Sequence, residues 1–199
     1  MLKVPGAFAS FVAAMTLTLC GVADAQQKAS SETTPAEKIP PVIMSKGHAA
    51  LCKVKVGDTL PDISLPTLSG GEQTRLSSLY GDRATVVIFW SSDRRMAREQ
   101  LADMGPEVVE RFGKLGVAVV GIAVGPEAAM LKAAKGDFPN LLDADGKAFA
   151  LVGTEKLPRT YVVDPQGKIL WFDIEYSLGT RRELQQALRA VAGEPPQGK

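Results

Sequence analysis

Two long apolar runs in the middle of the chain predict buried strands. Residues 84–90 form an unbroken stretch of apolar and β-branched side chains, and residues 117–124 form a second one. Strands that are apolar on both faces are expected at the centre of a covered sheet. The residues between them have apolar positions at spacings of three and four, which predicts a helix that Gly105-Pro106 should kink.

A second helix is expected over residues 126–135, because Pro126 suits the first position of a helix. The predicted order is therefore strand, helix, strand, helix. With right-handed crossovers, this order implies parallel central strands covered on both sides by helices.

The last third of the chain has a different pattern. Two short strands, 160–163 and 169–172, flank the turn sequence Asp-Pro-Gln-Gly at 164–167, which predicts an antiparallel hairpin. A closing helix follows, for which Thr180 and Glu183 fit a capping box. The expected sheet is therefore mixed.

The first 25 residues predict a secretory signal peptide. Lys3 precedes an apolar run over 7–20, and Ala23-Asp24-Ala25 offers small residues for cleavage after Ala25. The run is too short to span a bilayer as a helix. A periplasmic or secreted protein is therefore expected. The alternative is a lipoprotein tethered to a membrane through Cys20, because residues 17–20 loosely fit a lipoprotein box.

The rest of the chain divides into three parts. Residues 26–50 are rich in Ser, Thr, Glu, Lys and Pro, which predicts a flexible linker. One globular domain is expected over 51–193 and a disordered tail over 194–199.

Composition excludes some kinds of partner. The chain has 23 Lys and Arg against 22 Asp and Glu, so its net charge of +1 favours neither nucleic acid nor an anionic membrane. His48 is the only histidine, which excludes a metal site built from several imidazoles. We expect no metal, no cofactor and no nucleic-acid partner.

The cysteines limit redox chemistry. Cleavage after Ala25 would leave Cys52 as the only thiol, which is then either free or paired with another molecule. Lys53 and Lys55 are the only cations next to it in the sequence. One interpretation is an unreactive cysteine at a domain edge. The other is a single reactive thiol assisted by His48.

Three stretches of the chain, 56–65, 86–90 and 157–168, resemble the TlpA/ResA type of thioredoxin-like protein. This type belongs to the wider alkyl-hydroperoxide-reductase/thiol-specific-antioxidant (redoxin) group, and the likeness extends over residues 54–193. The resemblance implies an α/β thioredoxin-like fold. Its central mixed β-sheet would be flanked by helices and preceded by an N-terminal β extension.

The resemblance breaks at the active-site turn. In that family, Trp-Cys-x-x-Cys begins the helix after the central strand, where the helix dipole favours the thiolate. Here Arg94 and Ala97 stand at the two cysteine positions and Asp93 stands at the tryptophan. No catalytic residue can therefore be assigned at this turn, because neither side chain can exchange disulfides.

Partner-binding residues are suggested by the same likeness. Pro158 matches the family's cis-proline, which presents neighbouring backbone to an extended partner. Together with the start of the helix, this suggests a site for an exported protein or peptide that comprises Asp93, Arg94, Arg95, Leu157, Pro158 and Arg159.

The arginines at this turn allow two interpretations. Arg94, Arg95 and Arg98 lie where exposed helix N–H groups also favour anions, so they fit an acidic partner. Alternatively, Asp93 and Glu99 neutralise them on a solvated surface.

Two functions follow from these observations. The first is a non-redox protein-binding or scaffold role on a degenerate active site. The alternative is thiol-disulfide oxidoreductase or antioxidant activity through Cys52. The sequence leaves open whether the protein is an enzyme.

Overall fold

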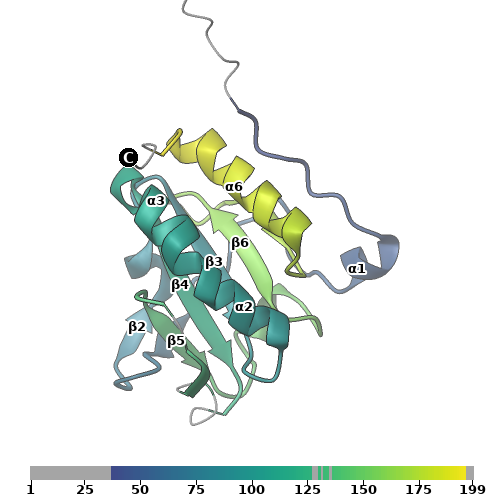
Figure 1. Cartoon of the computed structure of the whole chain (residues 1–199). Helices are drawn as coiled ribbons and strands as arrows, with labels where there is room; N and C mark the ends of the chain where they lie inside the picture. The colour runs from purple at the N-terminus through teal and green to yellow at the C-terminus, as the bar shows by residue number, and fades with distance from the viewer. Residues whose placement is uncertain (1–36, 127–129, 131, 135, 196–199) are drawn as a thin grey trace, which may run out of the picture. The chain divides into compact units, whose positions relative to one another are not determined.

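The computed structural model describes residues 37–126, 130, 132–134 and 136–195. Its main feature is a five-stranded sheet in the order β5-β4-β3-β6-β7 (Figure 1). The strands are β3 (Ala84–Trp90), β4 (Val117–Val124), β5 (Asn140–Asp143), β6 (Arg159–Val163) and β7 (Ile169–Asp173).

The pairing of the strands confirms the predicted mixed sheet. β3 is central, all of its residues are buried, and it runs parallel to β4, which runs parallel to β5. β6 is antiparallel to both β3 and β7, so the predicted hairpin is present. The unbroken apolar run of β3 is explained by this position, since both of its faces are covered.

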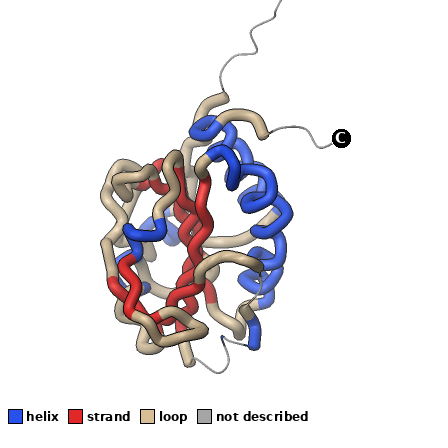
Figure 2. Tube along the Cα trace, turned by 90° about the vertical axis from the view of Figure 1, so that its left-hand side faces the viewer, coloured by secondary structure: helices blue, strands red, loops and turns tan. Residues whose placement is uncertain are grey.

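Both long helices cover one face of the sheet. α2 (Arg95–Met104) and α6 (Leu178–Ala192) lie side by side there, and Figure 2 shows the helices on one side of the strands. Leu101 of α2 and Leu184 of α6 join the cluster that contains Val86 and Ile88 of β3. The start of α2 lies close to the end of β3 because only residues 91–94 separate them.

The opposite face is covered by short elements, so the expectation of helices on both sides is only partly correct. These elements are β1 (Ser64–Pro66), β2 (Gln73–Arg75), the 3-10 turn η1 (Leu76–Leu79) and α5 (Phe149–Val152). Leu60 and Leu76 pack there with Val87 and Phe89 of β3. The antiparallel β1–β2 pair confirms the N-terminal β extension. The helix expected over 126–135 lies partly outside the described residues.

The helix after β3 is interrupted where the sequence predicted. α2 is followed by a π-helical turn, η2 (Gly105–Val109), then by α3 (Glu110–Phe112) and the 3-10 turn η3 (Gly113–Leu115). Pro106 has no N–H to donate, and a π turn accommodates that loss within a continuous helical path. The apolar side of this path stays buried.

The start of α6 corrects the predicted capping box. Ser177, not Thr180, is the N-cap, and its Oγ accepts a hydrogen bond from the backbone N–H of Thr180 at 3.2 Å. The Thr180 hydroxyl donates instead to Oδ2 of Asp173 at the end of β7, at 2.7 Å. The helix therefore begins three residues earlier than expected.

Residues 37–50 correct the predicted linker, because they pack against the domain. Ile39 and Val42 contact the core, and Glu37 pairs with Arg189 of α6 at 2.5 Å. α1 (Lys46–Ala50) follows, capped by the side chain of Ser45. Burial of Ile39 and Val42 favours this packing. The composition of the segment, which is rich in proline and lysine, does not indicate it.

Several expectations concern residues that the structure does not describe. These are the signal peptide over 1–25, lipidation of Cys20, the linker over 26–36 and the tail over 196–199. In the described part of the chain, no helix has the length and apolarity needed to cross a membrane.

Candidate functional site

The turn between β3 and α2 is where the sequence resemblance places the family's dithiol. β3 ends at Trp90, and α2 begins at Arg95 with Arg94 as its N-cap. Residues 91–97 contain no cysteine. Arg94 has an extended backbone, and its side chain makes no capping hydrogen bond, so the guanidinium is free to face outward.

Arg94, Arg95 and Arg98 each contact an acidic side chain or a backbone carbonyl. Nε of Arg94 lies 3.4 Å from Oδ2 of Asp93, and Nη1 of Arg95 lies 3.0 Å from Oε1 of Glu99. Arg98 donates to the carbonyl of Ser92. The neutralising contacts that the sequence suggested are therefore present, and all three guanidinium groups remain on the surface.

Ala97 stands one helical turn beyond Arg94 and is fully buried in the main core cluster. Its methyl group packs beneath the turn and offers nothing to a ligand. Of the two positions at which the resemblance places cysteines, only Arg94 is accessible.

A hollow of about 570 Å³ opens beside Arg94. Three segments line it: the start of α2, the loop before β6, and the chain that follows β7. The lining residues are Arg94, Met96, Glu155, Lys156, Leu157, Pro158, Ile174, Glu175 and Tyr176. Five of the six predicted partner-binding residues lie at the start of α2 or in the loop before β6, and of these Arg94, Leu157 and Pro158 line the hollow itself.

The loop before β6 has an unusual backbone. Glu155 and Lys156 have φ values of +51° and +36°, which place two consecutive non-glycine residues in the left-handed region. Each such residue costs on the order of 1–3 kcal/mol unless its surroundings hold it. The Leu157–Pro158 peptide bond that follows is cis.

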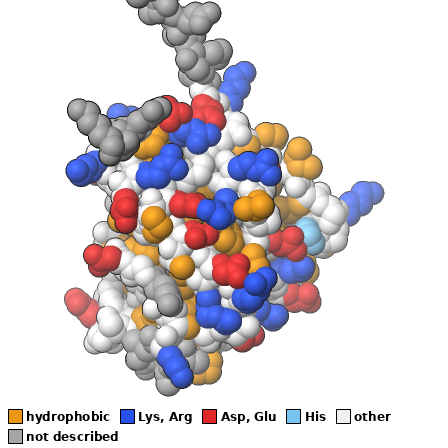
Figure 3. Space-filling model, in the orientation of Figure 1, with side chains coloured by type: hydrophobic (Ala, Val, Ile, Leu, Met, Phe, Trp, Pro, Cys, Tyr) orange, Lys and Arg blue, Asp and Glu red, His pale blue; other side chains and the backbone are white. Residues whose placement is uncertain are grey.

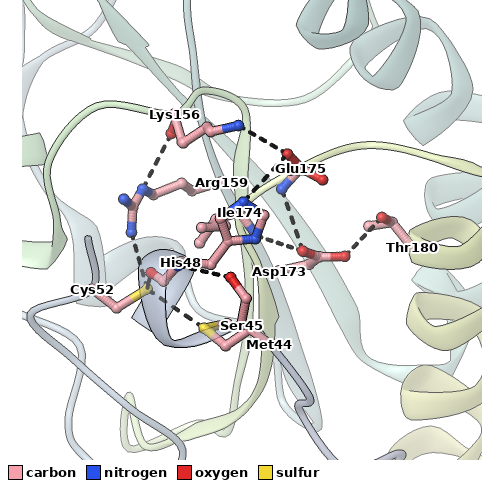
Figure 4. Close-up of polar contacts among 10 residues, drawn as sticks. All are labelled: Met44, Ser45, His48, Cys52, Lys156, Arg159, Asp173, Ile174, Glu175 and Thr180. Atoms are coloured by element: carbon pink, nitrogen blue, oxygen red, sulfur yellow. Dashed lines mark hydrogen bonds and ion pairs between the residues drawn. The ribbon is translucent and has the colours of Figure 1, made fainter. Parts of the chain in front are cut away.

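An ion pair stabilises this loop. Nζ of Lys156 lies 3.0 Å from Oε1 of Glu175, and Nε2 of His48 lies 3.9 Å from the same oxygen (Figure 4). On the face that carries α2 and α6, basic and acidic side chains are interspersed and form no large patch of one sign (Figure 3). The hollow therefore offers local rather than extended charge.

Tyr176 fixes the far wall of the hollow to α2. Its hydroxyl donates to Oδ2 of Asp103 at 2.6 Å. Burial, and then the hydrogen bond to Asp103, raise the pKa of Tyr176 well above its usual range. The hydroxyl therefore stays protonated and keeps donating over the physiological pH range.

Arg159 is a correction to the predicted site. It is 0% exposed, and its guanidinium donates to the carbonyls of Leu51, Thr154 and Lys156 at 2.9, 2.6 and 3.2 Å. It also lies over the ring of Phe149. Because Arg159 is enclosed on the side away from α2, it is not available to a partner in the hollow.

Cys52 lies beside the buried guanidinium of Arg159 and does not line the hollow beside Arg94. Its Sγ is 3.5 Å from Nη1 of Arg159, 3.4 Å from the carbonyl of His48 and 4.0 Å from Sδ of Met44 (Figure 4). The expected help from the His48 ring is wrong, because that ring is directed at Glu175. The cation next to the thiol is Arg159, which is far away in the sequence.

Sequence reasoning missed several residues of the hollow. Met96, Lys156, Glu175 and Tyr176 line it without having been singled out. Proximity to Pro158 could have indicated Lys156. The sequence did not mark Glu175 or Tyr176 as partner-binding residues. The segment that carries them is joined to α2 by the hydrogen bond from Tyr176 to Asp103. Among the residues that the structure describes, no group of three or more His, Cys, Asp or Glu could hold a metal ion.

Comparison with known proteins agrees with this architecture. The model of the AhpC/TSA family matches residues 56–172, which is more than half of the chain. The thiol-disulfide oxidoreductase ResA of Geobacillus thermodenitrificans is 28% identical over 142 residues, which cover 69% of this chain and 79% of that protein.

Solved structures show the same fold. Peroxidoxin BcpB of Mycobacterium tuberculosis has a TM-score of 0.59 and 26% identity, over 68% of this chain and 97% of the other. A secreted M. tuberculosis disulfide oxidoreductase homologous to E. coli DsbE has a TM-score of 0.55 and 22% identity, over 65% and 96%. With its thioredoxin-like fold and without a Cys-x-x-Cys motif, the chain belongs to the AhpC/TSA family.

Proposed function

We propose that this protein is an exported, non-redox member of its family that binds a protein or peptide partner in the hollow beside Arg94. The observation that supports the proposal is that the hollow is formed by the turn, the loop of Pro158 and the segment that follows β7, although the turn contains no cysteine. A docking surface can persist where the exchange chemistry has been lost.

The lining favours an extended segment with both apolar and acidic side chains. Met96, Leu157 and Ile174 supply apolar surface, and Arg94 supplies a guanidinium at the rim. Guanidinium groups bind carboxylates well, and extended peptides commonly place alternate side chains into pockets. We therefore expect the partner to insert an apolar side chain and to place a carboxylate near Arg94.

The absence of a thiol at the turn supports a role other than exchange. Thiol-disulfide exchange passes through a mixed disulfide, so it needs a thiolate at the point of contact with the substrate. The accessible residue at that point is Arg94. A scaffold or holding role needs only binding.

Peptide binding tests this proposal directly. Ten-residue segments tiled from exported proteins of the source organism would be screened on an array, and the binders measured by fluorescence anisotropy. Arg94→Glu should weaken the binding of acidic segments by about tenfold, because one favourable ion contact becomes repulsive. Arg95→Glu is the matched control, since Arg95 lies next in the chain but does not line the hollow. Equal effects of the two variants, or no binding by any segment, would refute the proposed site.

A disulfide-reduction assay tests the non-redox part. The wild-type protein and Cys52→Ser should both reduce insulin no faster than dithiothreitol alone. Turnover by the wild type that disappears in Cys52→Ser would instead establish the alternative, an oxidoreductase acting through Cys52.

Export is part of the same proposal. It is supported by the predicted signal peptide and by the likeness to a structure described as secreted. Fractionation of the producing cells should yield a mature chain that begins at Gln26. A membrane-bound chain that begins at a lipidated Cys20 would favour the lipoprotein alternative, and an intact Met1 would contradict export.

A further inference from the structure

The outer face of α6 has no role in the proposed function. A stripe of residues at spacings of three and four follows this face over about 16 Å of helix. With two residues of the neighbouring helical path, the stripe lines a hollow of about 780 Å³, which we call the α6 groove. Its lining residues are Glu107, Arg111, Leu178, Arg181, Arg182, Gln185, Gln186 and Arg189.

Side-chain contacts join the two walls of the α6 groove. α6 forms one wall, and η2 with α3 forms the other beside it (Figure 1). Nε2 of Gln185 donates to the carbonyl of Glu107 at 3.0 Å, and its Oε1 accepts from Nη1 of Arg111 at 2.8 Å. Arg181 also pairs with the Glu107 carboxylate. A groove that is held in shape in this way needs little rearrangement when a partner binds.

Two of the four arginines in the groove already have carboxylate partners. Arg181 pairs with Glu107, and Arg189 pairs with Glu37 at 2.5 Å. Because these guanidinium groups are neutralised, they contribute structure more than attraction for an anion.

The other two, Arg111 and Arg182, contact no carboxylate among the residues that the structure describes. Arg111 donates to the side chain of Gln185, and Nε of Arg182 donates to the carbonyl of Leu178 at 3.3 Å. Both arginines are exposed. Guanidinium groups bind carboxylates well, so the groove offers two cationic positions to an acidic partner.

Leu178 supplies an apolar position at the start of the same stripe. It is 70% exposed, so a partner that covers it gains the free energy of apolar burial. The aliphatic stems of the neighbouring arginines extend this apolar surface. The groove therefore combines an apolar contact with two unpaired cations.

The shape and charge of the α6 groove favour a protein segment over a membrane or a nucleic acid. A flat bilayer surface would leave much of a concave hollow unfilled. A nucleic acid would bring successive phosphates close to Glu107 in the groove and to the exposed Glu110 and Glu183 beside it. A short segment with few carboxylates can place them at Arg111 and Arg182 alone.

We propose that the α6 groove binds an acidic amphipathic helix of a partner protein. A helix suits the groove because side chains three and four residues apart on it match the spacing of the stripe. Its carboxylates pair with Arg111 and Arg182, and an apolar side chain covers Leu178. This inference goes beyond the binding proposed beside Arg94 and does not rest on it, because the two linings share no residue.

Titration of the ¹⁵N-labelled full chain with a defined peptide tests the proposal. The probe is a helical peptide of about fourteen residues, in which Glu and Leu recur at spacings of three and four and Ala fills the rest. The control probe has Lys in place of each Glu. Amide signals of residues 107–111 and 178–189 should shift with the acidic probe only. No shift in these segments, or equal shifts with both probes, would overturn the proposal.

Two matched double variants locate the site. Arg111→Glu with Arg182→Glu should weaken binding of the acidic probe at least about tenfold, because two favourable ion contacts become repulsive. Lys114→Glu with Lys168→Glu makes the same change in net charge at exposed lysines outside the groove, and should weaken binding less than about twofold. Equal effects of the two double variants would refute the site. Should the charge-reversed chain fail to fold, Arg111→Gln with Arg182→Gln replaces it, with an expected loss of about fivefold.

Single variants separate the groove from the hollow beside Arg94. Arg94→Glu should leave binding of the acidic probe unchanged, and Leu178→Ala should weaken it severalfold. Leu151→Ala, at another exposed leucine outside the groove, is the control and should have no effect. A probe that shifts residues 94–98 and 155–158 instead, and that Arg94→Glu releases, would refute the α6 groove while supporting the other site.

Two further probes test the class of partner. They are vesicles of phosphatidylcholine and phosphatidylglycerol in equal parts, and a single-stranded thymidine oligonucleotide. Neither should bind more tightly than the acidic peptide. Tighter binding of either one that is lost in Arg111→Glu with Arg182→Glu would overturn the assignment to a protein partner.

Discussion

Arginines in two regions of this protein meet their surroundings in opposite ways. Arg94 and Arg95 at the start of α2 are exposed and pair with neighbouring carboxylates. Arg159 at the start of β6 is fully buried and pairs with carbonyls and a sulfur. Exposed guanidinium groups can exchange one partner for another at little cost, whereas a buried one organises the groups around it. The first region therefore suits the proposed binding of a partner, and the second holds together the segments that contain Leu51, Thr154 and Lys156.

The largest expected effect is on stability, at Arg159. Arg159→Ala removes a fully buried side chain and the donors to the carbonyls of Thr154 and Lys156, while the Leu51 carbonyl keeps the Thr154 N–H. Each buried group left unpaired costs about 1–3 kcal/mol. Allowing for entry of water, we expect the free energy of unfolding in urea to fall by about 3 kcal/mol. Arg95→Ala, the exposed control, should change it by less than about 0.5 kcal/mol. Similar losses in the two variants would remove the contrast between the regions.

Salt should separate the two regions next. The Debye length falls from about 10 Å at 0.1 M to about 3 Å at 1 M, and buried pairs are screened much less than exposed ones. Binding of acidic segments near Arg94 should therefore weaken severalfold between these concentrations. The alkylation rate of Cys52 by neutral iodoacetamide should stay within about twofold. A parallel decline of both quantities would show that Arg159 is not shielded from solvent ions.

Acid should distinguish them through a third arginine, Arg189. Its hydrogen bond to Glu37 lowers the pKa of that carboxyl, against the opposing effect of burial. The pair therefore contributes fully above the unfolded pKa of Glu, about 4.3, and its contribution is lost as pH falls through the lower folded value. The protection factors for amide hydrogen exchange over residues 37–45 should fall in that window. Those around Arg159 should not, because its carbonyl partners do not titrate. Glu37→Gln should show the faster exchange already at neutral pH.

The smallest effect is expected at the surface pair itself. Arg95 and Glu99 are four residues apart on α2 and are both largely exposed. A double-mutant cycle with Arg95→Ala and Glu99→Ala, measured by urea unfolding, should give a coupling of about 0.3–0.5 kcal/mol. A coupling above about 1 kcal/mol would mean that this helix start is far more rigid than its exposure suggests.

Local patterns predicted much of the fold. The apolar runs of β3 and β4 and the turn residues of the hairpin each depend on neighbouring residues, so the mixed sheet followed from them. The cap of α6 was misplaced because Ser177 and Thr180 both suit that role, and packing against β7 selected Ser177. The candidate site was predicted only where the family resemblance marked residues, at Arg94, Leu157 and Pro158.

The amino-acid sequence alone determined the fold class, the family resemblance and the lack of a Cys-x-x-Cys motif, because these depend on the order of residue types. Only the tertiary structure decided that residues 37–50 pack on the domain and that Arg159 faces Cys52 rather than a partner. The reason is physical. All residues of β6 are buried, so no alternation of polar and apolar side chains marks the face on which Arg159 lies, and the distant segment that covers it is set by packing across the whole chain.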